Sequence, residues 1–137
     1  MPTRPSAASG GLGKPPKRIL WAEDNEGDRL LIRMALKETG NRSEVRFVAD
    51  GPALLEALEG TQPDLVVLDL NMPGMHGIEV LQRMRAHRSM RDTPVAIFSS
   101  STNPGELARC AQLGARHIVP KPMEHDAFNQ AVASLAV

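Results

Sequence analysis

Leu65-Val66-Val67-Leu68-Asp69 is an unbroken apolar run that ends directly in a carboxylate. A continuous Leu/Val run of this length is typical of a strand covered on both faces, as in a parallel sheet. In open α/β sheets, ligands bind in the crevice beyond the carboxyl ends of such strands. A carboxylate buried there costs free energy unless a cation pairs with it. We therefore expect Asp69 to face a cation at one edge of a sheet.

Residues 17–22, which end in the apolar run Ile19-Leu20-Trp21-Ala22, also predict a short strand, and the acidic pair Glu23-Asp24 follows it directly. If these carboxylates converged with Asp69 they would repel each other at neutral pH, and a divalent cation among them would remove the repulsion. Mg²⁺ prefers oxygen ligands and keeps several of its waters, so it needs few protein carboxylates. In the alternative interpretation, Glu23 and Asp24 only cap a helix that begins near Glu26, where acids are favourable.

Two further predicted strands, residues 93–98 and 117–120, end in Ser99 and Lys121. Four strand ends thus carry an acid pair, an acid, a hydroxyl and an ammonium group, which together suit a phosphoryl group. Asp69 can be the nucleophile, because aspartyl phosphates are known covalent intermediates. Mg²⁺, Lys121 and Ser99 can each stabilise charge on the phosphoryl oxygens.

Helical apolar stripes separate these strands, and residues 44–48 supply one more strand, so strand and helix alternate five times. Such alternation with short loops predicts an α/β fold, with a parallel sheet and helices on both faces. Pro120 lies inside the last predicted strand, where it removes a hydrogen-bond donor. An edge strand tolerates that loss.

The ordered set of motifs resembles the response-regulator receiver domain of two-component signalling. In that family an acidic pair follows the first strand, an acceptor Asp the third, Ser or Thr the fourth and Lys-Pro the fifth. The corresponding residues here are Glu23-Asp24, Asp69, Ser99 and Lys121-Pro122. The resemblance covers residues 17–137. It implies a flavodoxin-like sheet of five strands in the order 2-1-3-4-5, with the site at the topological switch. It also implies a cis peptide bond before Pro122.

The resemblance further implies the role of each site residue. Asp69 would accept the phosphoryl group, and Ser99 and Lys121 would bind its oxygens. Asp24, Asp69 and the backbone carbonyl of Asn71 would bind Mg²⁺ directly, with Glu23 acting through a bound water. Asp69 would receive its phosphoryl group from a sensor histidine kinase or a phosphorelay protein. The chain would thus assist its own phosphorylation and dephosphorylation, signal by a conformational change, and not be an enzyme in the ordinary sense.

The chain ends shortly after the last predicted helix, so we expect a stand-alone receiver. The segment 23–30 and the loop around residues 99–105 resemble the regulators that partner hybrid sensor kinases and bacterial phytochromes. Members of that subgroup often form homodimers, so a weak homodimer is expected.

Ile118 is a departure from the family, which usually has Tyr or Phe three residues before the strand-five lysine. Rotation of that aromatic ring reports phosphorylation to the far surface, whereas isoleucine is smaller and its χ1 is stiff. The departure leaves open a phosphorylation-independent adaptor that only keeps the receiver fold. A phosphohydrolase of the haloacid-dehalogenase type also uses an Asp nucleophile. The pattern of that family is Asp-x-Asp, however, whereas residue 71 of this chain is Asn.

Composition limits the remaining possibilities. The 137 residues are 42% hydrophobic with a formal net charge of zero, which favours one globular domain and gives no bulk charge for nucleic-acid binding. We expect no membrane span and a cytoplasmic location, since there is no long apolar run and Cys110 has no internal partner. Residues 1–16 are rich in Pro, Gly and Ser and predict a disordered leader, which places the receiver domain at residues 17–137.

Overall fold

The computed structural model describes residues 16–137, so residues 1–15 of the predicted leader lie outside the described part. Strands and helices alternate along the described chain. The strands are β1 (Arg18–Ala22), β2 (Glu44–Val48), β3 (Leu65–Leu68), β4 (Val95–Ser99) and β5 (His117–Pro120). The helices are α1 (Glu26–Glu38), α2 (Gly51–Gly60), α3 (Gly77–Ala86), α4 (Pro104–Gln112) and α5 (His125–Leu135).

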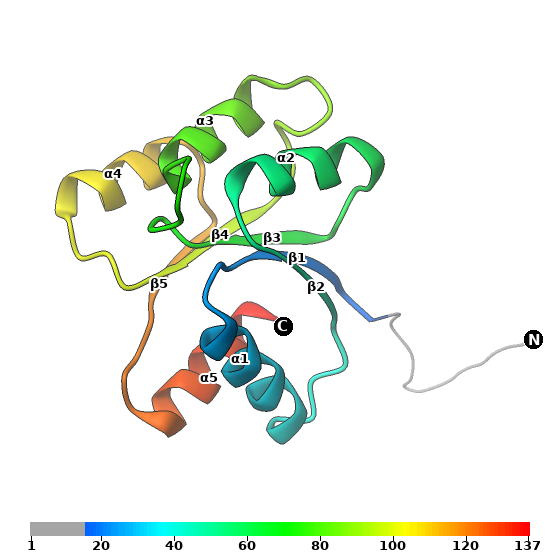
Figure 1. Cartoon of the computed structure of the whole chain (residues 1–137), viewed down its shortest axis with the longest axis vertical. Helices are drawn as coiled ribbons and strands as arrows, with labels where there is room; N and C mark the ends of the chain where they lie inside the picture. The colour runs from blue at the N-terminus through cyan, green and yellow to red at the C-terminus, as the bar shows by residue number, and fades with distance from the viewer. Residues whose placement is uncertain (1–15) are drawn as a thin grey trace, which may run out of the picture.

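The strands form one parallel sheet in the order β2-β1-β3-β4-β5, which confirms the predicted fold and strand order. Figure 1 shows α1 and α5 on one face of the sheet, and α2, α3 and α4 on the other. The chain runs from β1 to the β2 edge and then returns past β1 to β3. The strand order therefore reverses between β1 and β3, and the helices that follow these two strands leave toward opposite faces.

Each face of the sheet has its own apolar core. In β1, Leu20 and Ala22 belong to the core under α2, α3 and α4, whereas Ile19 and Trp21 belong to the core under α1 and α5. All four residues of β3 are buried, as expected for a central strand covered on both sides. These alternating contacts fix which side chains of β1 and β3 face each layer of helices.

Strand β5 lies at an edge of the sheet, as the proline within it predicts. Pro120 pairs with Ser99 of β4, and the amide nitrogen of Lys121 donates to the carbonyl oxygen of Ser99 at 3.0 Å. All peptide bonds of the described residues are trans, so the expected cis bond before Pro122 is wrong. The trans chain continues the pairing with β4 by one residue and still turns the Lys121 side chain toward the other strand ends.

Helix α1 is capped by Asn25, whose side-chain oxygen accepts a hydrogen bond from the backbone nitrogen of Asp28 at 2.8 Å. Glu23 and Asp24 precede this cap. The interpretation that they serve only as the helix cap is therefore wrong, and their carboxylates are available for another role.

Within residues 16–137, no helix has both the length and the apolar character needed to cross a membrane.

Candidate functional site

Four strands bring the polar residues selected from the sequence to the end of the sheet where their carboxyl termini lie. Glu23 and Asp24 follow β1, and Asp69 follows the neighbouring strand β3, where Ala22 pairs with Leu68. Ser99 ends β4, and Lys121 follows β5. The acids lie where the strand order reverses, which is the usual ligand position in this type of sheet.

Asp69 is only 5% exposed, and both of its carboxylate oxygens have partners. Oδ1 accepts hydrogen bonds from the Ser99 hydroxyl at 2.8 Å and from the Asn71 backbone nitrogen at 2.9 Å. Oδ2 accepts from Lys121 Nζ at 2.9 Å. The cation expected beside Asp69 is thus in part Lys121, and the hydroxyl of Ser99 is already in contact with the carboxylate.

Lys121 Nζ lies among three carboxylates. It is 2.7 Å from Glu23 Oε1, 2.9 Å from Asp28 Oδ2 and 2.9 Å from Asp69 Oδ2. Burial alone would lower the pKa of Lys121, but the approach of these carboxylates outweighs burial and holds that pKa above its usual value. The amine is therefore a permanent ammonium ion at the site.

Glu23 has no exposed surface. Burial is the main cause that raises the pKa of Glu23 above its usual value; the nearby Asp69 raises it further, and Lys121 opposes the shift. Its Oε2 accepts a hydrogen bond from the Asn25 backbone nitrogen. Its Oε1 forms an ion pair with Lys121 Nζ. This buried oxygen accepts no well-aligned hydrogen bond from any described residue.

The donor set fits a hard divalent cation. Glu23, Asp24 and Asp69 each offer a carboxylate oxygen, and these oxygens all lie within 4.8 Å of one another. Such a set suits Mg²⁺, and the buried Glu23 Oε1 without a hydrogen-bond partner is an oxygen that a cation or its water would satisfy. Asn71 lies in the loop beyond Asp69, and its backbone nitrogen donates a hydrogen bond to the Asp69 carboxylate, so the backbone of Asn71 lies beside this set.

Asp28 is a member of the site to which sequence patterns assigned no role. It lies in the first turn of α1, and its carboxylate accepts a hydrogen bond from Lys121 Nζ. The only sequence signal is its spacing, four residues after Asp24. That spacing alone does not distinguish a site residue from an acid that stabilises a helix N-terminus.

A second polar network, also missed by sequence reasoning, joins the loops around the site. Glu106 of α4 accepts a hydrogen bond from the Ser101 hydroxyl at 2.7 Å and lies 3.1 Å from His76 Nε2. His76 caps α3, and its Nδ1 accepts from the Ile78 backbone nitrogen. Ser101 in turn donates its backbone nitrogen to the Ser99 hydroxyl at 3.2 Å. Contacts therefore run without a break from Asp69 to α4.

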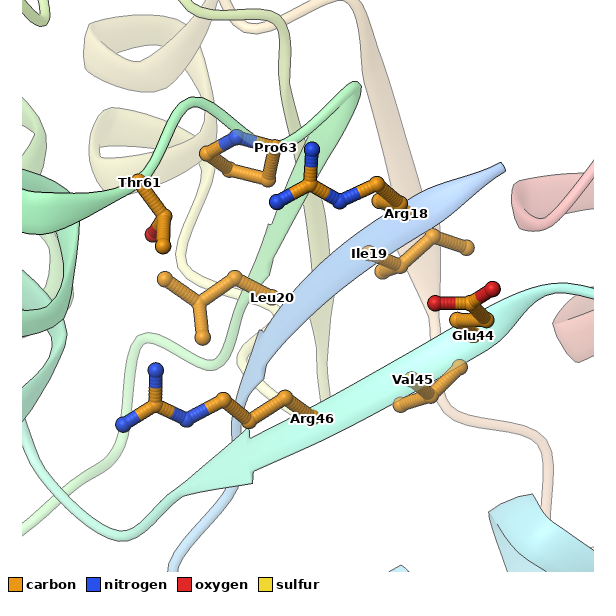
Figure 2. Close-up of a pocket in the computed structure, with 8 residues that line it drawn as sticks. All are labelled: Arg18, Ile19, Leu20, Glu44, Val45, Arg46, Thr61 and Pro63. Carbon is orange, nitrogen blue, oxygen red and sulfur yellow. The ribbon is translucent and has the colours of Figure 1, made fainter. Parts of the chain in front are cut away.

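Figure 2 shows a surface pocket of about 300 Å³ at the opposite end of the sheet. Arg18, Glu44 and Arg46 line it in the first half of β1 and β2. Glu23, in contrast, follows the last residue of β1. The pocket is therefore distinct from the acidic site around Asp69, none of whose residues line it.

A family model of the response regulator receiver domain matches residues 19–133. The chain therefore belongs to the response regulator receiver family, a class of phosphoacceptor signalling domains. It is 34% identical over 122 residues to the sensory/regulatory protein RpfC of Xanthomonas campestris pv. campestris, which covers 88% of this chain and 16% of RpfC. The chain thus spans about a sixth of the length of that relative.

Solved structures are similar over nearly the whole described chain. The phosphorylated cyanobacterial phytochrome response regulator RcpA has a TM-score of 0.80 and 29% identity, over 88% of this chain and 91% of RcpA. The Mn²⁺-bound form of response regulator Rcp1 has a TM-score of 0.77 and 26% identity, over 87% of this chain and 91% of Rcp1.

Proposed function

We propose that this receiver domain accepts a phosphoryl group on Asp69 from a sensor histidine kinase or a phosphorelay protein, and that phosphorylation biases its conformation. The observation that carries the proposal is the surroundings of one carboxylate. Asp69 contacts an ammonium ion and a hydroxyl, and it shares a divalent-cation donor set with Glu23 and Asp24.

The transfer follows from these contacts. A carboxylate oxygen of Asp69 attacks phosphorus, an O–P bond forms, and the P–N bond of the donor phosphohistidine breaks with its electron pair returning to the imidazole. Lys121 stabilises negative charge on the phosphoryl oxygens, and Ser99 donates a hydrogen bond to one of them. Mg²⁺ held by Asp24, Asp69 and the Asn71 carbonyl, and by Glu23 through a bound water, would neutralise further negative charge on the phosphoryl oxygens.

The signal would leave the site through the loop after β4. Ser99 now donates to Asp69 Oδ1, and esterification of Asp69 offers its hydroxyl the new phosphoryl oxygens instead. Because Ser99 is joined through Ser101 to Glu106, a shift of Ser99 alters the contacts that hold the start of α4. Phosphorylation thus biases an equilibrium between two arrangements of this loop and helix, without an aromatic ring at Ile118.

The partner that we propose is a phytochrome-like or hybrid sensor kinase. Two observations support it: the similarity in fold and sequence to the phytochrome response regulator RcpA, and the identity with part of the sensory/regulatory protein RpfC. Phosphotransfer profiling against the histidine kinases of the same cell would identify the donor. Preferential transfer from a kinase without a phytochrome or hybrid architecture would contradict this choice of partner.

Labelling by a small acyl phosphate tests the proposal directly. With Mg²⁺, the intact protein should gain the mass of one phosphoryl group, and Asp69→Asn should gain none because an amide cannot form the acyl phosphate. A chelator should prevent labelling of the unchanged protein. The matched control is Asp126→Asn, which alters an exposed acid on α5 and should label normally. Labelling that survives in Asp69→Asn would overturn the assignment.

A second candidate function is a phosphorylation-independent adaptor, which the isoleucine at position 118 favours. Ile118 is half-buried in β5, and it packs against the core beneath α4 without an aromatic ring to rotate. The two functions differ in how partner binding responds to phosphorylation. An adaptor would bind its partner equally well as unmodified protein, as acyl phosphate and as Asp69→Asn.

A further inference from the structure

We infer that Asp28 is a positioning residue that holds the Lys121 ammonium ion while a divalent cation occupies the carboxylates of Glu23 and Asp69. The inference rests on the proposed function, since it concerns the same site. It adds a fourth acid to the residues that the receiver motifs select.

The geometry around Lys121 Nζ poses a competition. The ammonium group has three donors, and it lies near the three oxygens of Glu23, Asp28 and Asp69. Two of these acids also belong to the cation donor set, together with Asp24. A metal ion, or a water bound to it, and the ammonium ion therefore compete for the carboxylates of Glu23 and Asp69, and the two cations repel each other.

Among residues 16–137, Asp28 is the one acid paired with Lys121 that lies outside the metal donor set. The side chain of Lys121 is only 12% exposed, so water alone does not replace a lost carboxylate partner. When a cation takes the other two acids, Asp28 keeps the ammonium ion paired. Without Asp28, Lys121 has only the metal-binding carboxylates to pair with, and metal binding has to break those pairs.

The position of Asp28 is set by the helix and not by its own carboxylate. Its backbone nitrogen donates to the Asn25 cap, and this hydrogen bond survives any change of the side chain. Helix α1 packs against α5 on the sheet, so the first turn that carries Asp28 is held in place. The change Asp28→Asn therefore removes the charge and leaves the helix start intact.

Mg²⁺ titration followed by the fluorescence of Trp21, or by calorimetry, tests the inference without any phosphorylation. Asp28→Asn should weaken Mg²⁺ binding about tenfold, the lower end of the loss typical when a residue that supports a metal site from outside its ligands is changed. Asp28→Glu, which keeps the charge, should recover most of the affinity. The matched control is Glu26→Gln in the same turn, whose carboxylate is almost fully exposed and pairs with Arg29. It should change the affinity less than about twofold.

A double-mutant cycle with Lys121→Met separates positioning from a general loss of negative charge. Without the ammonium ion, Asp28→Asn should cost only the through-space attraction to Mg²⁺, about threefold or less. An effect of Asp28→Asn that is equal with and without Lys121 would overturn the inference. If Lys121→Met does not fold, equal affinities for Asp28→Asn and Asp28→Glu overturn it. If the unchanged protein binds no Mg²⁺, the proposed function fails as well.

Discussion

Gly77 follows the loop of residues 70–76 after Asp69 and brings the end of that loop into contact with its beginning. The Gly77 nitrogen donates to the carbonyl oxygen of Leu70 at 3.1 Å. A Cβ atom at Gly77 would lie 2.7 Å from the carbonyl oxygen of Asp69 and 2.7 Å from Leu70 Cα. Both neighbours are backbone atoms beside the proposed acceptor. A side chain at position 77 therefore has to displace the backbone of residues 69–70.

Gly77→Ala should destabilise the protein by about 2 kcal/mol and should slow labelling of Asp69, because steric strain falls on the backbone that carries the acceptor. Urea unfolding and acyl phosphate labelling measure the two effects. Gly60→Ala is the control: its Cβ would meet nothing within 4 Å at the end of α2, and it should be neutral or slightly stabilising. Equal stability of the two variants would contradict this account of Gly77.

Arg85 at the end of α3 ties three segments together. Its guanidinium donates to the carbonyl oxygens of Leu113 and Thr93 at 2.8 Å, of Arg91 at 3.0 Å and of Gly114 at 3.2 Å. These acceptors lie in the turn before β4 and in the turn between α4 and β5. The planar fork of arginine can reach several carbonyls at fixed angles, which a lysine ammonium cannot.

Arg85→Lys should lower the free energy of unfolding by roughly 2 kcal/mol, since two or more hydrogen bonds from a charged donor are lost. The matched control is Arg83→Lys in the same helix, where an exposed pair with Glu79 is the only charged contact among the described residues. That exposed pair should contribute less than about 1 kcal/mol. Urea denaturation of both variants measures the difference, and a loss as small for Arg85→Lys as for Arg83→Lys would refute the anchoring role.

Stability of the whole molecule should depend on Mg²⁺ and on pH together. Burial raises the pKa of Glu23 above 4.5 in the folded protein, so the folded state binds more protons than the unfolded state just above pH 4.5. The contribution of Glu23 to stability is thus present below that pH and is lost as the pH rises through its folded pKa. A cation that binds the ionised carboxylate reverses this loss.

Thermal unfolding with and without Mg²⁺ should therefore show a stabilisation that grows as the pH rises above the folded pKa of Glu23. At a free Mg²⁺ concentration of about 100 times its dissociation constant, binding adds about 2.7 kcal/mol. NaCl of equal ionic strength is the control for screening, and Glu23→Gln should flatten the pH dependence. A stabilisation by Mg²⁺ that is the same at low and neutral pH would contradict the linkage.

Apolar runs and motif order were enough to predict the α/β class, the central strands and the family. Residues 65–68, for example, form β3 with every residue buried, and Pro120 lies in an edge strand. Burial on both faces requires a continuous apolar run, so this information is local and is readable from one segment. The four strand ends that carry polar groups were readable for the same reason.

Polar contacts between distant segments were not predictable in this way. The four carbonyls around Arg85 and the contact between Asp28 and Lys121 each depend on how helices pack on the sheet. Glutamate, aspartate and arginine are also common on exposed helix faces, so their presence alone gives no signal. The cis bond before Pro122 was expected only from the family resemblance. In the structure this bond is trans, and the backbone of Lys121 continues the pairing with β4.

Hydrophobic periodicity and the order of charged residues thus determined which fold this chain adopts and which side chains reach the sheet edge, because both follow from spacing along the chain. Tertiary structure alone decided how those side chains share one ammonium ion: Lys121 lies 52 and 93 residues from its hydrogen-bond partners Asp69 and Asp28. Such contacts form only when parallel strands and a packed helix end at the same place, and their energies depend on burial that no single segment can supply.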